Sequence, residues 1–331
     1  MKKISLVTGC AGFIGSHMCD YLLLKKHSVI GIDNLISGKR KNLKDSFKNK
    51  SFKFVKDDIK NIEKICKRNK VRKIDYIFHF AGHGELIPSI ENPLDYLNNN
   101  ALKTAILLDY VRKNFNIKKF VYAASSSCYG NNDNITNEKD KIKTEHPYAF
   151  SKYTGEQICL HWSKVYKLPI ISIRIFNAYG PRSRTNNVYG AVIGVFLKQK
   201  LSNHPLTIVG SGKQKRDFLY ISDVCEAFFK AAISKYKNEI FNLGRGYAES
   251  VNYLSSLISD NKKFIPWRPG EPFKTEANIN KIKRYLKWKP KISLKNGIKE
   301  VIKNIRYWEK APLWTPKKIK LATKEWIKYL K

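Results

Sequence analysis

A tyrosine and a lysine stand four residues apart near the middle of the chain, at Tyr148 and Lys152. In a helix this spacing places both side chains on one face, one turn apart. A lysine ammonium beside a phenol favours the phenolate, which lowers a tyrosine pKa from its ordinary value of ~10. We therefore interpret Tyr148 as a general base that takes a proton from an alcohol, and Lys152 as the residue that adjusts its pKa.

Three consecutive serines give this pair a chemical context. Ser125, Ser126 and Ser127 follow the apolar run from Val121 to Ala124, which is typical of a buried strand. Ligands bind at the carboxyl ends of strands in open α/β sheets. We expect Ser125 to hydrogen-bond the reacting oxygen, completing a group of orienting residue, base and pKa modifier.

A glycine-rich turn near the N-terminus predicts a second kind of site. Gly9, Gly12 and Gly15 stand between a strand over residues 4–8 and a helix that begins near Phe13. Such glycines permit a tight turn, close approach of a pyrophosphate to the helix N-terminus, and close packing of helix on strand. Asp33 ends the next strand, about 20 residues on, where a carboxylate accepts both hydroxyls of an adenosine ribose. The sequence therefore predicts a dinucleotide site that prefers NAD to NADP.

Alternating strands and helices must position these residues. Strand-like runs continue at residues 52–55, 76–80, 119–123 and 170–175, and helical patterns separate them at 93–113 and 151–166. The fold class predicted is α/β, a Rossmann-like doubly wound parallel sheet with a smaller C-terminal lobe. We expect an NAD-binding domain over 1–176 and a mainly substrate-binding lobe over 177–331. Parts of that lobe, such as a helix over 222–234, are expected to pack back on the first domain.

Composition narrows the classes of partner. The formal charge is +36, but the excess lysines are scattered along the chain and no nucleic-acid-binding motif accompanies them. No apolar run approaches the ~20 residues needed to span a bilayer. The six cysteines are dispersed, without the spacing of metal ligands. We expect a cytoplasmic protein with no metal, no nucleic acid and no membrane as partner.

Eight motifs occur in an order that resembles a known family. They are TGCAGFIGS, DN, DDI, HFAG, SSSCYG, YAFSK, RIFNAYGP and RDFLYISDV, and they span nearly the whole chain. The chain is thereby identified as similar to the NAD-dependent epimerase/dehydratase family of extended short-chain dehydrogenases/reductases, and it resembles the UDP-glucose/UDP-galactose 4-epimerase branch. The resemblance implies enzyme-bound NAD, a nucleotide-sugar substrate that is UDP-linked, and a homodimer.

The resemblance also implies roles for individual residues. Catalytic roles fall to Ser125, Tyr148 and Lys152. The implied cofactor-binding residues are Gly9, Gly12, Phe13, Ile14, Gly15, Asp33, Asn34, Ser37, Gly38, Asp58, Ile59, Phe80, Ala81, Gly82, Asn99, Tyr148, Lys152 and Phe176. The implied substrate-binding residues are Ser125, Ser126, Asn177, Arg216, Arg268 and Glu271, of which the arginines suit a diphosphate because their planar forks pair with phosphate oxygens.

Ser126 and Ser127 bear on which reaction the site performs. Dehydratases that resemble this chain carry an acidic pair or a glutamate at these positions, which removes water across C5 and C6 of the sugar. Without a carboxylate, the 4-keto sugar is expected to turn over and take the hydride back on its other face. We therefore favour a nucleotide-sugar 4-epimerase that acts on UDP-glucose/galactose or an N-acetyl form. An NDP-sugar 4,6-dehydratase and, from another class, a non-catalytic NAD-binding sensor are the alternatives.

The substrate pocket leaves further alternatives open. Thr275 resembles the family position where a small residue admits an N-acetyl group. Arg182 and Arg184 are instead suited to the carboxylate of a uronic acid, which would indicate a UDP-glucuronate 4-epimerase. The C-terminal tail has no mechanistic role in this interpretation. Its aromatic and aliphatic spacing predicts an amphipathic helix that packs on the protein or on a partner subunit.

Overall fold

The computed structural model describes residues 2–183 and 191–330. Its centre is a parallel sheet of seven strands in the order β12-β7-β5-β4-β1-β2-β3. The strands are β1 (Ile4–Thr8), β2 (Ser28–Asp33), β3 (Phe52–Lys56), β4 (Tyr76–His79), β5 (Lys119–Ser125), β7 (Ile170–Ile175) and β12 (Glu239–Leu243). The predicted fold class, a doubly wound α/β sheet, is confirmed.

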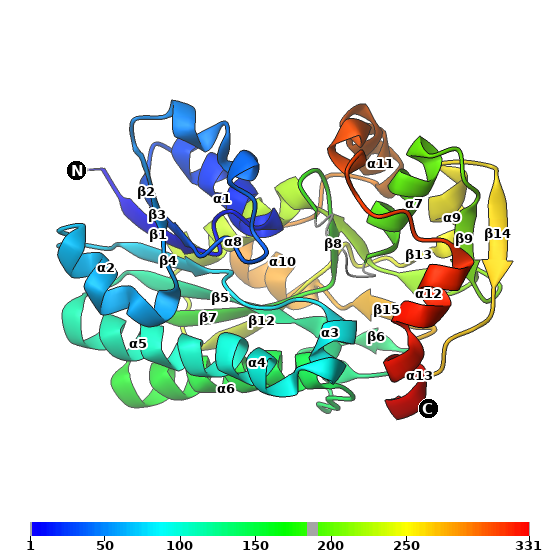
Figure 1. The fold of residues 1–331 in the computed structure, drawn as a ribbon. Coiled ribbons are helices and arrows are strands. Elements are labelled where there is room, and N and C mark those ends of the chain that lie inside the picture. The colour runs from blue at the N-terminus through cyan, green and yellow to red at the C-terminus, as the bar shows by residue number, and fades with distance from the viewer. Residues whose placement is uncertain (1, 184–190, 331) are drawn as a thin grey trace.

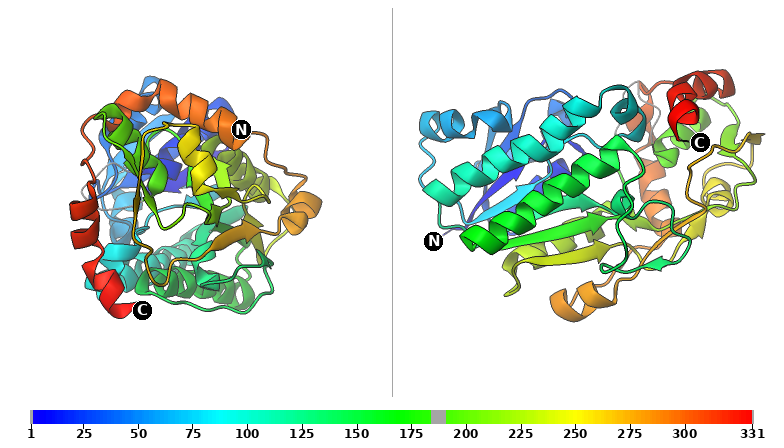
Figure 2. Two further views of the ribbon diagram at one scale, coloured as in Figure 1. Left: turned by 90° about the vertical axis from the view of Figure 1, so that its right-hand side faces the viewer. Right: turned by 90° about the horizontal axis from the view of Figure 1, so that it is seen from below.

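Helices cover both faces of this sheet (Figures 1 and 2). On one face α1 and α8 pack together against the strands, with α10 nearby, and on the other face α5 packs on α6 beside α2. Each face has its own apolar core. The helices are α1 (Phe13–Leu24), α2 (Ile62–Arg68), α3 (Leu86–Glu91), α4 (Pro93–Leu97), α5 (Lys103–Asn114), α6 (Pro147–Tyr166), α8 (Ile221–Ile233) and α10 (Asn280–Leu286).

The second lobe is a set of short elements at the carboxyl end of the sheet (Figure 1). It has its own core, in which Phe196 and Trp308 are fully buried. Its elements are β6 (Ile135–Thr136), β8 (Asn177–Tyr179), α7 (Val192–Leu201), β9 (Leu206–Val209), β10 (Lys215–Arg216), β11 (Phe218–Tyr220), β13 (Glu249–Ser250), α9 (Val251–Ser256), β14 (Lys262–Ile265), β15 (Lys274–Ala277), α11 (Leu294–Lys303), α12 (Pro316–Ala322) and α13 (Lys324–Tyr329).

The chain crosses between the lobes more than once. After β8 begins the second lobe, α8 and β12 return to the central sheet, where β12 pairs in parallel with β7. The expected boundary between an NAD-binding domain over 1–176 and a substrate-binding lobe over 177–331 stays a prediction. Among the described residues, no helix combines the length and the apolar character that crossing a membrane requires.

One predicted helix is interrupted. The pattern over residues 93–113 forms α4 and α5, joined by a π-helical turn over Asn98–Leu102. Such turns shift the side chains that follow relative to a regular helix, and they are frequent at functional sites. This turn sets the direction of Asn99 and Asn100.

Candidate active site

The predicted site residues gather at one edge of the sheet. They follow the carboxyl ends of the strands: Gly9 to Gly15 after β1, Asp33 to Gly38 after β2, Asp58 and Ile59 after β3, Phe80 to Gly82 after β4, Ser125 at the end of β5, and Phe176 after β7. Strand order reverses between β1 and β4, because the chain moves outward from β1 to β3 and then returns to β4. In doubly wound sheets a ligand binds in the crevice at this point.

Tyr148 and Ser125 meet directly. Helix α6 begins at Pro147, after a cap in which His146 Nδ1 accepts a hydrogen bond from the N–H of Ala149 at 3.2 Å. This start places Tyr148 in the first turn, and its hydroxyl donates to Ser125 Oγ at 3.2 Å. Lys152 lies one turn further along the same helix and is 9% exposed. The structure therefore joins Tyr148 to Ser125 directly and places Lys152 one helical turn away.

The serine cluster is internally hydrogen-bonded. Ser125 Oγ and Ser127 Oγ lie 2.8 Å apart, and the Ser127 N–H donates to Ser125 Oγ at 3.2 Å. Ser126 begins the short 3-10 turn that follows β5 and is partly exposed. The cluster offers hydroxyl groups, rather than a carboxylate, to a ligand at this edge.

Burial governs the charges of Tyr148 and Lys152. Burial raises the pKa of Tyr148, and the hydrogen bond with Ser125 opposes this rise. Burial lowers the pKa of Lys152 to about 8. The Lys152 ammonium lies 4.4 Å from the centre of the Tyr122 ring. The net direction for the pKa of Tyr148 is therefore upward, and the expected lowering of this pKa by Lys152 stays a prediction.

The glycine turn is tightly packed, which explains two of its glycines. Gly9 has φ +67°, and a Cβ there would come within 2.7 Å of the backbone nitrogen of Ala81, in the segment after β4. A Cβ at Gly15 would collide with the Gly9 carbonyl oxygen. Gly12 is the N-cap of α1 and has no side chain to cap it. No side chain caps the first N–H groups of α1, which leaves them available to a pyrophosphate.

Asp33 is held in a fixed orientation at the end of β2. Its Oδ2 accepts a hydrogen bond from the N–H of Ala11 at 2.9 Å, and its Oδ1 accepts one from Leu35 at 2.8 Å. A Cβ at Gly38 would come within 2.7 Å of Asp33 Oδ1, so glycine keeps the space beside the carboxylate open. Each carboxylate oxygen retains capacity for a second hydrogen bond. The residues present therefore fit the ribose of a dinucleotide.

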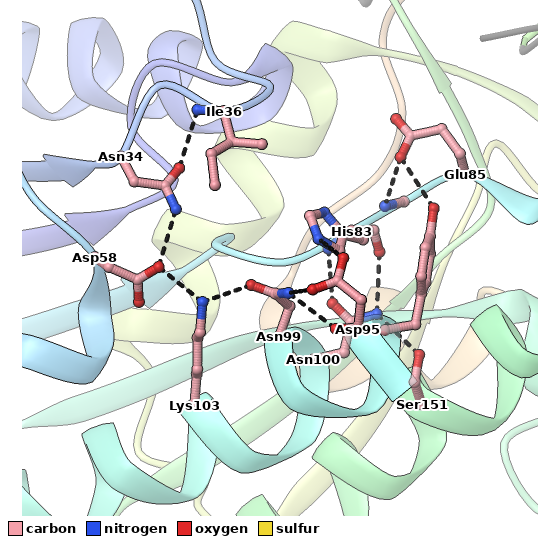
Figure 3. Close-up of polar contacts among 12 residues, drawn as sticks. Asn34, Ile36, Asp58, His83, Glu85, Asp95, Asn99, Asn100, Lys103 and Ser151 are labelled. Carbon is pink, nitrogen blue, oxygen red and sulfur yellow. Dashed lines mark hydrogen bonds and ion pairs between the residues drawn. The ribbon is translucent and has the colours of Figure 1, made fainter. Parts of the chain in front are cut away.

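A polar chain links the segment after β2 to the segment after β3 (Figure 3). Asp58 Oδ2 accepts hydrogen bonds from Asn34 Nδ2 at 3.0 Å and from Lys103 Nζ at 2.7 Å. Lys103 also donates to Asn99 Oδ1 at 2.7 Å. Burial alone would raise the pKa of Asp58, but the hydrogen bond from Lys103 and its companions hold it below its usual value. Sequence reasoning missed Lys103, which looks like one more lysine on a helix.

The neighbouring residue, Asn100, organises the segment after β4. It is 1% exposed, whereas Asn99 is partly exposed and bonded to Lys103 and Asp95. Asn100 Oδ1 accepts from the His83 N–H at 2.7 Å, and its Nδ2 donates to the His83 carbonyl and to Ser151 Oγ. A Cβ at Gly82 would collide with Asn100 Oδ1. Asn100 therefore joins the segment after β4 to the helix that carries Tyr148 and Lys152.

One further side chain that the sequence did not single out, Tyr96, lies close to Tyr148. The Tyr96 ring packs edge-on against the Tyr148 ring, with 6.4 Å between centres. The Tyr96 hydroxyl donates to Glu85 Oε2 at 3.4 Å, and His83 Nε2 lies 2.9 Å from Asp95 Oδ2 (Figure 3). No motif marks Tyr96, because it reaches Tyr148 only through the packing of α4 on α6.

The predicted substrate residues form a second group in the other lobe. Glu271 holds both arginines, with Arg216 Nη2 at 3.0 Å and Arg268 Nη2 at 2.9 Å. Arg216 in β10 stands opposite Thr275 in β15. The Thr275 hydroxyl donates to Oδ1 of the exposed Asn177 at 3.0 Å. Two guanidinium groups that share one carboxylate leave this group with positive charge, which suits a diphosphate.

Arg182 does not join this group. Its guanidinium pairs with Asp20 at 2.6 Å and with Asp45 at 3.3 Å, on the α1 side of the fold. Arg184, the other arginine considered for a uronic acid carboxylate, lies outside the described residues. For Arg182 the simplest interpretation is structural, since both of its partners are acidic side chains of the same chain.

This geometry is that of α/β enzymes that bind a dinucleotide at the carboxyl edge of a parallel sheet and act on an alcohol through tyrosine and lysine. Within that class, the sequence model of the NAD dependent epimerase/dehydratase family matches residues 5–244. The chain belongs to this family, its cofactor is NAD, and the resemblance stated from its motifs is confirmed.

Individual relatives agree with this assignment. The chain is 37% identical to the uncharacterized UDP-glucose epimerase YtcB of Bacillus subtilis, over 88% of this chain and 95% of that protein. Among solved structures, the UDP-glucuronic acid 4-epimerase of Bacillus cereus in complex with UDP-glucuronic acid and NAD is similar with a TM-score of 0.83 at 32% identity, covering 92% of this chain and 99% of the other. The UDP-glucose 4-epimerase of Thermotoga maritima with UDP-glucose is similar with a TM-score of 0.84 at 31% identity, covering 92% and 98%.

Proposed function

We propose that this protein is a nucleotide-sugar 4-epimerase that inverts C4 of a UDP-hexose, either UDP-glucose/galactose or an N-acetyl form. The observation that carries the proposal is the hydrogen bond from Tyr148 to Ser125 beside Ser126 and Ser127, with no carboxylate at those two positions. The names of its relatives support it, because they include UDP-glucose, UDP-glucuronate and UDP-N-acetylglucosamine 4-epimerases.

The residues at the carboxyl edge suit the proton transfers of this reaction. Ser125 would hold the C4 hydroxyl, and Tyr148 would take its proton as hydride leaves the same carbon. NAD supplies the reversible acceptor for that hydride. Once the 4-keto sugar has turned over, Tyr148 returns the proton to the C4 oxygen and hydride returns to the opposite face, so the reaction neither consumes nor releases reducing equivalents.

The second lobe has to hold the nucleotide during that turn. Arg216 and Arg268 are the proposed diphosphate ligands, with Glu271 fixing both. Asn177 and Thr275 lie beside Arg216, at the end of the lobe that faces the sheet edge. A small residue at Thr275 leaves room for an N-acetyl group, which is why we include the N-acetyl forms.

One experiment tests the reaction and the substrate together. The protein is incubated in D₂O with UDP-, dTDP-, GDP- and CDP-hexoses and UDP-glucuronate, and the products are identified by NMR and mass spectrometry. We expect a C4 epimer of a UDP-hexose with no deuterium at C5. Loss of water, or deuterium at C5, would favour the dehydratase, and turnover of UDP-glucuronate alone would favour the UDP-glucuronate 4-epimerase. The homodimer stays a prediction, which sedimentation would check.

A further inference from the structure

The C-terminal tail, residues 311–330, is attached to the second lobe where it begins. Gln199 Nε2, in α7, donates to the Trp314 carbonyl at 2.7 Å. Ile319, in α12, is 2% exposed, so the first helix of the tail is packed on the protein. The tail continues to α13, which packs against α3 of the first lobe (Figures 1 and 2). It therefore connects the two lobes on the outside of the fold.

At its far end the tail contacts the Arg268–Glu271 loop. Trp326 is 9% exposed, and its Nε1 donates to the Pro269 carbonyl at 2.7 Å. The Arg268 guanidinium lies 5.5 Å from the centre of the Trp326 ring, within the range of a cation–π interaction. Gly270 has φ +71°, and a Cβ there would come within 2.8 Å of the Leu330 carbonyl oxygen. The loop and the tail are thus in close contact along three consecutive residues.

This loop presents the two arginines proposed for the diphosphate. Glu271 bridges Arg268 and Arg216, so a displacement of the loop would move both guanidinium groups. Arg216 is anchored in β10, whereas Arg268 and Pro269 lie between β14 and β15, outside regular structure. The indole of Trp326 donates a hydrogen bond to the backbone of this irregular stretch from outside.

We propose that Trp326 is a positioning residue for nucleotide binding. The tail fastens the Arg268–Glu271 loop to α3 through this indole and so holds the arginines at the separation that a diphosphate requires. Helix α3 follows the segment that carries His83 and Glu85, so the same contact fixes the spacing between the diphosphate loop and the Tyr148 side of the site. This inference rests on the proposed function, because it takes the nucleotide diphosphate as the ligand.

The test compares two substitutions of Trp326 with a control on the same helix. Trp326→Ala removes the ring and the N–H, whereas Trp326→Phe keeps a smaller aromatic ring and removes the donor. Tyr329→Ala is the control, because Tyr329 is 60% exposed. Affinity for UDP is measured by calorimetry, KM and kcat with the accepted nucleotide sugar, and bound NAD after denaturation.

We expect Trp326→Ala to weaken UDP binding roughly tenfold and to raise KM in proportion, through loss of a hydrogen bond and a cation–π contact. Trp326→Phe should recover part of the loss, and Tyr329→Ala should bind UDP as the parent does. NAD content and kcat should stay near parental values in all three. If Trp326→Ala fails to fold, the Phe variant decides the outcome.

Two outcomes would overturn the inference, and they are distinguishable. UDP binding at the parental affinity in a folded Trp326 variant would show that the tail does not position the loop, while leaving the proposed function intact. A parent protein that retains NAD but binds no UDP would overturn the proposed function itself, and the inference with it.

Discussion

Replacing Tyr148 by phenylalanine should lower the stability of the protein only slightly but lower its turnover strongly. The substitution therefore separates the role of the hydroxyl in catalysis from its role in folding. The change removes one hydroxyl that donates to Ser125. Ser125 Oγ keeps its partners in Ser127, the hydroxyl at 2.8 Å and the N–H at 3.2 Å. No buried group is left unsatisfied, so the free energy of unfolding should fall by only about 1 kcal/mol, the usual worth of one neutral hydrogen bond.

The effect on turnover should be far larger. General acid–base catalysis contributes roughly 10²- to 10⁴-fold, so kcat should fall by that factor, which corresponds to about 3–5 kcal/mol in the activation barrier. Binding of NAD should persist, because the ring and Lys152 remain. Product formation from the accepted nucleotide sugar is followed by NMR at saturating substrate, with bound NAD and thermal stability measured on the same preparations.

The matched control is Tyr166→Phe, at the other end of α6, where the side chain is 44% exposed. It should behave as the parent does in all three measurements. A Tyr148→Phe protein that retains NAD and turns over within about threefold of the parental kcat would remove Tyr148 as the base, since such a change is far below the contribution of a general base.

Three further predictions concern the cofactor and two of the buried lysines, Lys103 and Lys152. Denaturing the purified protein should release NAD, and a titration that shows preference for NADP would contradict the role given to Asp33. Lys103→Met should weaken NAD binding roughly tenfold, because Asp58 loses a charge-assisted hydrogen bond; unchanged affinity would mean that Asp58 needs no such support. In NAD-free protein, burial lowers the pKa of Lys152 to about 8 from its ordinary 10.5, so the unfolded chain holds the extra proton between these values. The unfolding free energy of the parent should therefore rise with pH relative to Lys152→Met across this window, by about 3 kcal/mol at most, and parallel curves would contradict the shift.

Much of the fold could be predicted because its signals are local. The strands at 4–8 and 170–175 were predicted with the bounds that the structure gives, and the strand predicted to end at Asp33 does end there, since short apolar runs flanked by turns determine them. The meeting of Ser125 with Tyr148 was also predictable. Ser125 ends a strand and Tyr148 lies at the start of a helix, and these two ends lie at the same edge of a parallel sheet.

The parts that escaped prediction depend on details of register or on distant segments. Asn99 stays a predicted cofactor residue, whereas the sequence did not single out Asn100 as the buried partner of the segment after β4. Both lie in a π-helical turn, which a pattern of apolar residues does not reveal. Lys103 reaches Asp58 across 45 positions in the sequence. The contact of Trp326 with Pro269 is likewise long-range, and the spacing of the tail predicted only that it would pack somewhere.

The charges of Tyr148 and Lys152 must be considered together. Burial disfavours an isolated phenolate and an isolated ammonium. It therefore raises the pKa of Tyr148 and lowers the pKa of Lys152, which favours the neutral form of each side chain. A phenolate beside an ammonium is less costly than either isolated charge, because their attraction is strong where water is excluded. Tyr148 can therefore lose its proton readily only while Lys152 keeps its own. Burial lowers the pKa of Lys152 to about 8, so we expect activity to fall as the pH rises through this value, which a pH profile of kcat would check.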